Sequence, residues 1–182
     1  MNRLNTQNFR PSKLVNGASI LFLIAALTSC SLDGGTPQAN SNQTQEEQKM
    51  ADSQREYLSV SNDPGIEPTL GKPIGDAPTS LVARDIIVGN GDEVVSTSTV
   101  TAHYQLISWT SGEVLQSSWA NGPFTTTLDR VIEGWKQGLI GMKVGGRRLL
   151  VIPPELAYGS TGGGPVAPNE TIAFVVDLLN LQ

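Results

Sequence analysis

The chain has 182 residues and a formal net charge of -5, because 17 Asp and Glu outnumber 12 Lys and Arg. The basic residues are scattered, and Arg147 and Arg148 form the only adjacent pair. A chain of this kind lacks the basic stripe that nucleic acids require, so we expect no nucleic-acid partner. One histidine, His103, and one cysteine, Cys30, cannot build a zinc site, and there is no Walker-type phosphate loop. We therefore expect no metal and no cofactor.

Residues 1–29 have the features of an export signal. Three basic residues and no acidic residue precede an apolar run at 18–27, which is too short to span a bilayer comfortably. The run ends in the letters LTSC, which resemble a bacterial lipobox, where the cysteine is lipidated after cleavage. We therefore expect a lipoprotein signal peptide at 1–29 and an extracytoplasmic protein anchored to a bacterial membrane through Cys30. An ordinary signal peptide followed by an incidental cysteine is the alternative.

Residues 30–78 read as a linker that follows the lipidated Cys30. The stretch up to residue 56 is rich in Ser, Gln, Asn, Thr and Glu, and four prolines occur between 57 and 78. Such a composition buries too little apolar surface to offset the entropy of ordering, and the prolines favour extended segments. We expect a disordered, proline-containing tether here and a single domain at 79–182.

The domain is expected to combine short strands with one helix. Apolar residues recur at helical spacing from Ile132 to Met142 and include Trp135, which predicts a short amphipathic helix. Asp129 is expected to cap its start and Gly141 to end it. Strands are expected at 81–88, 96–109, 113–118, 123–128, 147–152 and 171–181. This pattern predicts an α+β fold with a curved antiparallel sheet wrapped around the helix.

Three ordered blocks of sequence carry a resemblance to a known family. They are VIEGW at 131–135, GMKVGGR at 141–147 and IPPELAYG at 152–159. Together they resemble the signature of the FKBP-type peptidyl-prolyl cis-trans isomerases, and the resemblance covers 79–182. It implies the FKBP-like fold and an isomerase that assists the folding of exported, proline-containing polypeptides. It also implies rapamycin-type macrolides as candidate ligands.

The resemblance also assigns a substrate pocket. The residues it implies as catalytic are Tyr104, Trp135 and Tyr158, with Trp135 as the floor under the proline ring and Tyr158 as a hydroxyl donor. The residues it implies as substrate-binding are Leu115, Gln116, Phe124, Val131, Ile132, Val166 and Phe174. The Ile132 backbone N–H is expected to hold a substrate carbonyl. His103 neighbours Tyr104 on a strand, so it is expected to point to the opposite face and to be structural.

Proline isomerisation suits a chain with so few reactive side chains. Rotation about an amide has a barrier of about 18–20 kcal/mol, but no covalent bond breaks, so no nucleophile is needed. The twisted transition state carries less charge separation than the planar amide, so a dry aromatic pocket favours it. Leu115 and Gln116 stand where the family usually has Phe-Asp, and Thr126 replaces a second Phe. These departures predict a reduced rate and leave two alternatives: a proline-binding chaperone module and a purely structural lipoprotein.

Overall fold

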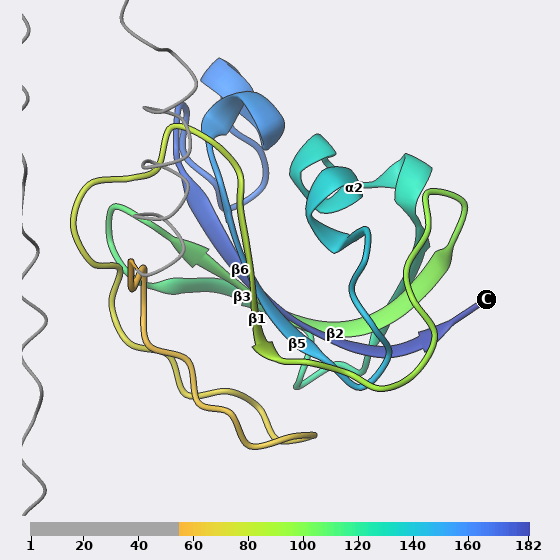
Figure 1. The fold of residues 1–182 in the computed structure, drawn as a ribbon. Coiled ribbons are helices and arrows are strands. Elements are labelled where there is room, and N and C mark those ends of the chain that lie inside the picture. The colour runs from red at the N-terminus through yellow and green to blue at the C-terminus, as the bar shows by residue number, and fades with distance from the viewer. Residues whose placement is uncertain (1–54) are drawn as a thin grey trace, which may run out of the picture. The chain divides into compact units, whose positions relative to one another are not determined.

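The computed structural model describes residues 55–182, which form six strands, one α-helix and three short 3-10 turns (Figure 1). The strands are β1 (Val82–Ile87), β2 (Thr99–Ser108), β3 (Val114–Ser117), β4 (Phe124–Thr127), β5 (Arg147–Ile152) and β6 (Ile172–Leu181). The helix is α2 (Glu133–Leu139), and the turns are η1 (Leu128–Arg130), η2 (Pro154–Leu156) and η3 (Gly159–Thr161). Every expected strand forms, with ends within three residues of the predicted bounds.

The strands make one antiparallel sheet. Its order is β1-β5-β6-β2-β3, and β4 also pairs with β2. The longest pairing joins β2 to β6, from Val100 opposite Leu181 to Ser108 opposite Ile172. In Figure 1 the sheet curves and α2 lies within its concave side. The predicted fold class, α+β with a curved antiparallel sheet around one short helix, is therefore confirmed.

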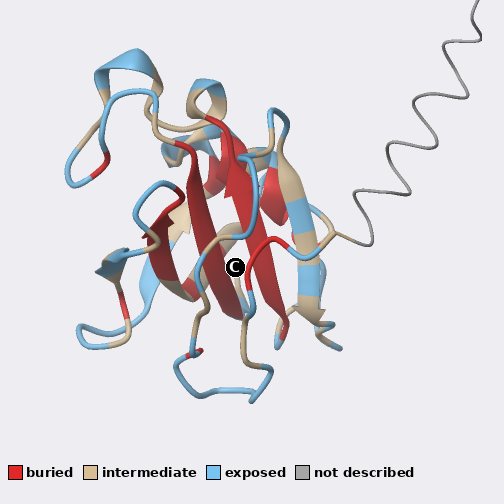
Figure 2. Ribbon diagram, turned by 90° about the vertical axis from the view of Figure 1, so that its left-hand side faces the viewer, coloured by how far each residue is buried: buried red, intermediate tan, exposed pale blue. Residues whose placement is uncertain are grey.

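The two central strands are buried on both faces. All six residues of β5 and the first seven of β6 are buried, and Figure 2 shows these buried strands side by side. A strand covered on one face alternates between buried and exposed residues, so an unbroken buried run requires a cover on each side of the sheet.

Helix α2 covers the inner, concave face. A Cβ added at Gly134 would lie 2.4 Å from the side chain of Ile152, and one at Gly138 would lie 2.7 Å from Leu150. These two glycines, one turn apart, let the helix backbone lie directly on β5. The inner core formed in this way comprises Val94, Val100, Ala102, Leu106, Leu128, Trp135, Leu139, Met142, Leu150, Ile152, Val166, Ile172, Phe174, Val176 and Leu178.

Residues 55–78, which we call the strap, cover the outer face, on the side of the sheet opposite α2 (Figure 1). Tyr57 is 1% exposed and packs edge-on against Trp109, with ring centroids 6.3 Å apart. Val60 bridges Leu70, which folds the strap back on itself. The outer core contains Tyr57, Leu58, Ile107, Trp109, Leu149, Val151, Ala173 and Val175.

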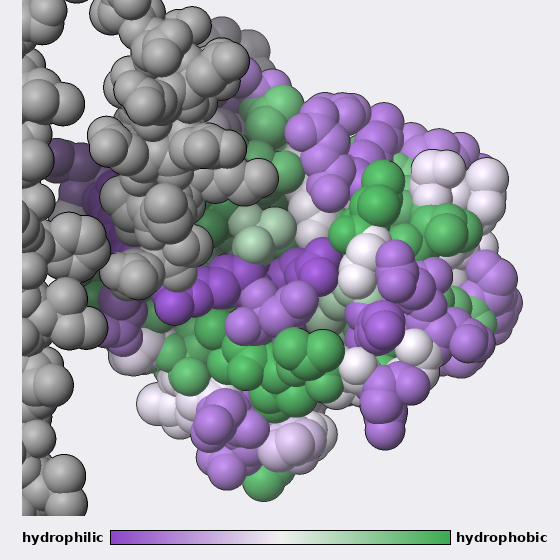
Figure 3. All heavy atoms as spheres, in the orientation of Figure 1, coloured by the Kyte–Doolittle hydropathy of each residue, from purple (hydrophilic) through white to green (hydrophobic). Residues whose placement is uncertain are grey.

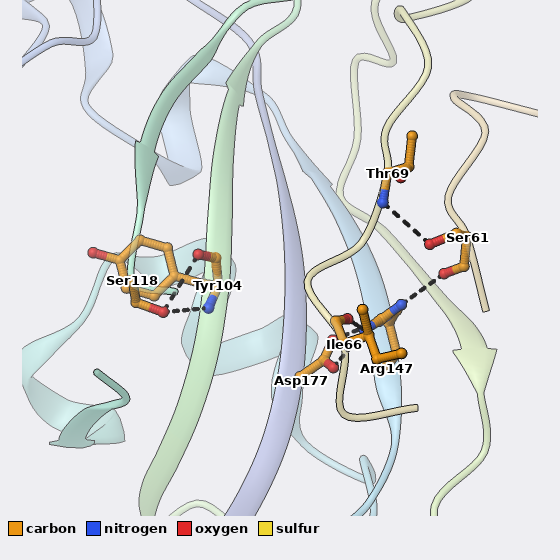
Figure 4. A network of polar contacts seen from close by, with 7 residues as sticks. All are labelled: Ser61, Ile66, Thr69, Tyr104, Ser118, Arg147 and Asp177. Carbon is orange, nitrogen blue, oxygen red and sulfur yellow. Dashed lines mark hydrogen bonds and ion pairs between the residues drawn. The ribbon is translucent and has the colours of Figure 1, made fainter. Parts of the chain in front are cut away.

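A buried arginine fastens the strap to the sheet. Arg147 is fully buried and donates from Nε and Nη2 to the carboxylate of Asp177, over 2.6 and 2.7 Å. Its Nη1 donates to the carbonyl of Ser61 and its Nη2 to that of Ile66, at 2.7 and 2.6 Å (Figure 4). The strap thus supplies backbone acceptors that help to satisfy a charge with no access to water.

The expectation of a disordered linker up to residue 78 is therefore wrong for the strap. Its average composition is polar, but a few apolar side chains, led by Tyr57 and Leu58, are spaced so that they meet the outer face. The predicted signal peptide at 1–29, the lipidated Cys30 and the linker at 30–54 lie outside the described residues, so they stay predictions. Between residues 55 and 182 no helix is long and apolar enough to cross a membrane.

The start of α2 also differs from expectation. Asp129 lies in η1, where it accepts a hydrogen bond from the Thr127 hydroxyl. The helix begins at Glu133 after Ile132, with no side-chain cap, so the prediction that Asp129 caps α2 is wrong. The reason is that η1 uses residues 128–130 before the chain extends into the helix. Gly141 has a φ of 77°, which confirms the left-handed ending.

The surface shown in Figure 3 carries apolar patches separated by hydrophilic residues. Among the described residues, large apolar side chains that are exposed include Ile66 at 63% and Val88 at 76%. Scattered exposure of this kind is ordinary for protein surfaces and marks no site. The candidate site is instead the cavity beside α2.

Candidate active site

A cavity of about 310 Å³ opens beside α2, a volume within the range of small-ligand sites. It draws residues from most of the sheet and from both segments that flank the helix. The lining residues are Tyr104 on β2, Gln116 on β3, Phe124 on β4, Arg130 at the end of η1, Val131 and Ile132, Trp135 on α2, Tyr158 between η2 and η3, and Phe174 on β6.

Four aromatic rings form the body of the cavity. The rings of Tyr104, Phe124, Trp135 and Phe174 meet edge to face, with centroids 5.3 to 6.5 Å apart. This arrangement places the positive edge of one ring against the negative face of another, which aromatic pairs favour. The result is an apolar box with few groups that hold water.

Trp135 lies at the bottom of this box. It sits near the start of α2 and is only 3% exposed, yet it lines the cavity. Its indole Nε1 is buried and has no hydrogen-bond partner among residues 55–182. The predicted roles of Trp135 as a floor and Tyr158 as a hydroxyl donor need both residues to line one cavity, and both line this one.

Tyr158 projects into the cavity from the short segment between η2 and η3. It follows η2 with φ -110° and ψ 4°, and its ring lies against Gly163. A Cβ added at Gly163 would lie 2.8 Å from Tyr158 Cδ1, so only glycine fits without a shift. Sequence reasoning passed over Gly163 as a supporting residue. Its place in the glycine run at 162–164 is the only signal that pointed to it.

Tyr104 keeps its proton at neutral pH. Burial of Tyr104 raises its pKa above the ordinary value of 10.0, and the nearby Tyr158 raises it further. A hydroxyl in such a setting is a hydrogen-bond donor and not a base. The cavity thus offers apolar surface and neutral donors, with no carboxylate among the residues that line it.

Arg148 holds the helix that carries Trp135. Its Nη1 donates to the carbonyls of Gly138 and Ile140, at 2.9 and 3.1 Å, which lie at the C-terminal end of α2. Its Nε and Nη2 donate to the carboxylate of Asp85 on β1, at 2.6 and 3.0 Å. A cation at this end of a helix also complements the helix dipole. Through Arg148, the helix that carries Trp135 is hydrogen-bonded to β5 and linked to β1.

Comparison with known proteins identifies the family. A sequence model described as FKBP-type peptidyl-prolyl cis-trans isomerase matches residues 91–179. A probable FK506-binding protein of Corynebacterium glutamicum is 44% identical over 115 residues, which cover 63% of this chain and 98% of that protein. The chain belongs to the FKBP-type peptidyl-prolyl cis-trans isomerase family.

Solved structures of FKBP-type proteins agree with this assignment. The crystal structure of FkpA from Escherichia coli matches with a TM-score of 0.56 and 30% identity, over 79% of this chain and 60% of FkpA. The structure of AtFKBP13 matches with a TM-score of 0.53 and 33% identity, over 58% of this chain and 96% of that protein. The family and its members support peptidyl-prolyl cis-trans isomerase activity for this chain.

The FKBP-type cavity contains most of the residues that the sequence assigned to it. Eight of the ten pocket residues expected from the sequence line the cavity. Leu115 and Val166 do not: they pack against the inner core, and Val166 is 5% exposed. Val166 lies in a tight turn, where its N–H donates to the carbonyl of Gly163 and its carbonyl accepts from the Gly163 N–H, at 2.9 and 3.0 Å. Arg130 lines the cavity and was not expected from the sequence, although it directly precedes the VIEGW block.

His103 lies outside the cavity, as expected. Its Nδ1 is 3.0 Å from the Ser118 hydroxyl, and its ring stacks on Trp119 with centroids 4.2 Å apart. The same hydroxyl accepts from the Tyr104 backbone N–H at 2.9 Å, as Figure 4 shows for Tyr104 and Ser118. His103 therefore helps to hold β2 against the segment that follows β3, and it does not line the cavity.

Proposed function

We propose that this protein is a lipid-anchored, extracytoplasmic peptidyl-prolyl isomerase that assists the folding of exported proline-containing polypeptides. The cavity with Trp135 below and Tyr158 beside it carries the proposal for the chemistry. The anchor rests on the sequence alone, on the apolar run at 18–27 that ends at Cys30.

Each cavity residue takes a role that follows from its position. Trp135 supports the proline ring from below, with Tyr104, Phe124 and Phe174 around it. Tyr158 donates its hydroxyl to the peptide, and the backbone N–H of Ile132 holds a substrate carbonyl. Val131, Ile132 and Gln116 form the rim. These groups stabilise a half-rotated imide because they exclude water and supply donors without a competing negative charge.

The energetic requirement is modest. A thousandfold acceleration corresponds to about 4 kcal/mol of transition-state stabilisation. A hydrogen bond to a neutral donor contributes about 0.5–1.5 kcal/mol, so desolvation in the aromatic box must supply the larger part. This division predicts that losing Trp135 is more damaging than losing the hydroxyl of Tyr158.

An isomerisation assay tests the chemistry directly. A protein containing residues 30–182 should speed cis-trans exchange of an X-Pro peptide above the buffer rate. Trp135→Ala should lower kcat/KM by more than tenfold, and Tyr158→Phe by about twofold to tenfold, since the latter removes one hydrogen bond. Glu56→Gln, at an exposed position on the strap, is the matched control and should match the parent protein. A parent rate equal to buffer would refute the isomerase proposal.

The anchor needs a separate test, because the cavity does not depend on it. Expression of the full chain in a bacterium fed a radiolabelled fatty acid should label the protein and place it in the membrane fraction. Cys30→Ser should lose both the label and the membrane fraction. Retention of the label in Cys30→Ser would contradict an anchor at Cys30, and a parent chain without label would favour an ordinary signal peptide.

A proline-binding chaperone module with little turnover is the second candidate. The observation that favours it is Gln116, a neutral amide on the cavity wall where the family usually has Asp. Replacement of Leu115 and Gln116 by Phe and Asp separates the two readings. Under the chaperone proposal this double change creates turnover that the native chain lacks, whereas under the isomerase proposal it only adjusts an existing rate.

Macrolide binding separates both candidates from a purely structural lipoprotein. Trp135 lies at the cavity floor, so rapamycin or a similar macrolide in the cavity should change tryptophan fluorescence. Trp109 and Trp119 provide a constant background because neither lines the cavity. A chain that binds neither peptide nor macrolide would leave only the structural role.

A further inference from the structure

Arg130 is the only formally charged side chain among the residues that line the cavity. It is exposed and ends η1, a turn that Leu128 anchors because its side chain is 3% exposed. The chain then extends through Val131, which also lines the cavity. The backbone that carries Arg130 is therefore fixed next to the rim, although its guanidinium is in water.

The guanidinium of Arg130 is also available. Within residues 55–182 it forms no salt bridge and no side-chain hydrogen bond. The nearest acid in sequence, Asp129, accepts a hydrogen bond from the Thr127 hydroxyl. That bond is the main cause of the lowered pKa of Asp129, and the charge of Arg130 is a smaller one. Arg130 thus keeps its five donors for another group.

The other groups around the cavity do not offset this charge. Gln116 is a neutral amide, and burial raises the pKa of Tyr104, whose hydroxyl is therefore neutral. Glu133, on the first turn of α2, bonds Gln137 and lies 3.5 Å from Lys136. Arg130 therefore supplies the one formal charge on the cavity lining, in a chain whose formal net charge is -5.

We propose that Arg130 selects substrates that carry an acidic side chain next to the proline. The proposal rests on the isomerase function of the same cavity. A proline seated over Trp135 places its neighbours at the rim, where a carboxylate can pair with a guanidinium through two hydrogen bonds. A lysine in the same position meets a like charge and gains nothing.

The expected preference is small but measurable. Exposed ion pairs contribute about 0–1 kcal/mol, which corresponds to at most about fivefold in kcat/KM. Salt shortens the range of such a pair from about 10 Å at 0.1 M to about 3 Å at 1 M. The ratio of kcat/KM for the Glu and Gln peptides should therefore approach one in about 1 M NaCl. The kcat/KM of an uncharged peptide should not show this loss.

The test is a set of peptides assayed with the protein containing residues 30–182. Glu, Gln, Ala and Lys are placed in turn before and after the proline, and kcat/KM is measured for each. We expect Glu to exceed Gln by about threefold to fivefold at one or both positions, and Lys to fall below Gln. In Arg130→Gln the Glu-to-Gln ratio should approach one, and Arg130→Lys should restore part of it.

Lys143→Gln is the matched control, since it removes one exposed positive charge away from the cavity. It should keep the full Glu preference, which excludes an effect of net charge alone. Equal kcat/KM for Glu and Gln peptides at both positions overturns the role of Arg130, and so does a Glu preference that survives Arg130→Gln. Absence of turnover on every peptide, Ala included, instead refutes the isomerase function, so the two failures are distinguishable.

Discussion

The two faces of the sheet are covered in different ways, and neighbouring arginines on β5 show the contrast. Arg148 points to the inner face, where it holds the end of α2 and the partly exposed Asp85. Arg147 points to the outer face, where Asp177 and two strap carbonyls enclose it completely. The inner cover leaves a cavity beside the helix, and the strap seals the opposite side.

This contrast separates stability from activity. No residue of the strap and neither member of the Arg147–Asp177 pair lines the cavity. All of the residues proposed to contact substrate project from the inner face or from the segments around α2. Changes on the outer face should therefore lower the free energy of unfolding and leave the chemistry of the folded protein intact.

The largest expected effect is the loss of Asp177. Asp177→Ala leaves the guanidinium of Arg147 buried without its carboxylate, and breaking a buried pair in this way costs about 3–5 kcal/mol. Urea unfolding followed by circular dichroism measures the change. Isomerase activity per folded molecule should be close to that of the parent protein.

The Arg148–Asp85 pair on the inner face should contribute less stability than the Arg147–Asp177 pair. Asp85 has 35% of its side chain exposed, and Arg148 keeps two carbonyl acceptors when Asp85 is lost. Asp85→Ala should therefore cost only about 1 kcal/mol. Similar costs for Asp85→Ala and Asp177→Ala would contradict the distinction between the two faces.

The next effect concerns the strap. Tyr57→Ala removes a ring that is 1% exposed and packs on Trp109, so it should lower the free energy of unfolding by about 2–5 kcal/mol. Near room temperature, where the variant stays folded, kcat/KM should be unchanged. Ile66→Ala is the control, because the Ile66 side chain is 63% exposed and should contribute less than about 0.5 kcal/mol. A loss of activity in folded Tyr57→Ala would show that the strap also shapes the cavity.

An intermediate effect is expected where the helix meets the sheet. Gly134→Ala places a Cβ 2.4 Å from the Ile152 side chain, and overpacking of this kind costs about 1–3 kcal/mol. It should also reduce kcat/KM, since Trp135 is the next residue and moves with α2. Gly65→Ala, with nothing near its Cβ but a φ of 71°, tests strain alone and should leave kcat/KM unchanged. A stable, fully active Gly134→Ala would disprove the close packing.

The inner face could be predicted from the sequence because its determinants are local. The VIEGW and AYG blocks place an indole and a phenol at fixed points of a helix and a turn, and both reach the cavity. The exceptions were set by backbone geometry. Val166 lies in the inner core, in a turn closed by Gly163, and Arg130 ends η1, a turn that the sequence did not predict.

The outer face could not be predicted in the same way. The strap has low average hydrophobicity, and its few apolar side chains gain stability only against residues far along the chain, such as Trp109 and Val175. Arg147 gave no sign that it would be buried, since arginine is seldom buried without a partner and its partners lie 30 and more residues away. Composition describes a segment in isolation, and the strap is ordered by contacts outside it.

The smallest effect concerns Glu170, which lies beside the turn between β2 and β3. Burial alone would raise the pKa of Glu170, but hydrogen bonds from the Ser108 hydroxyl and from Thr110 outweigh it, and the pKa falls below the ordinary 4.5. A carboxyl with a lowered folded pKa contributes stability above its unfolded pKa, and that stability is lost as the pH falls through the folded value.

Glu170→Gln should therefore cost about 1 kcal/mol near pH 7, where Glu170 is ionised and holds the start of the β2–β3 turn. Near pH 3 the cost should be smaller, because the parent protein loses the same interaction as the pH falls through the folded pKa of Glu170. Urea midpoints at the two pH values measure both numbers. Glu113→Gln is the control: its side chain forms no hydrogen bond within residues 55–182, so the midpoint should hardly move. A cost for Glu170→Gln that is the same at both pH values would mean that Glu170 acts through its shape and not through its charge.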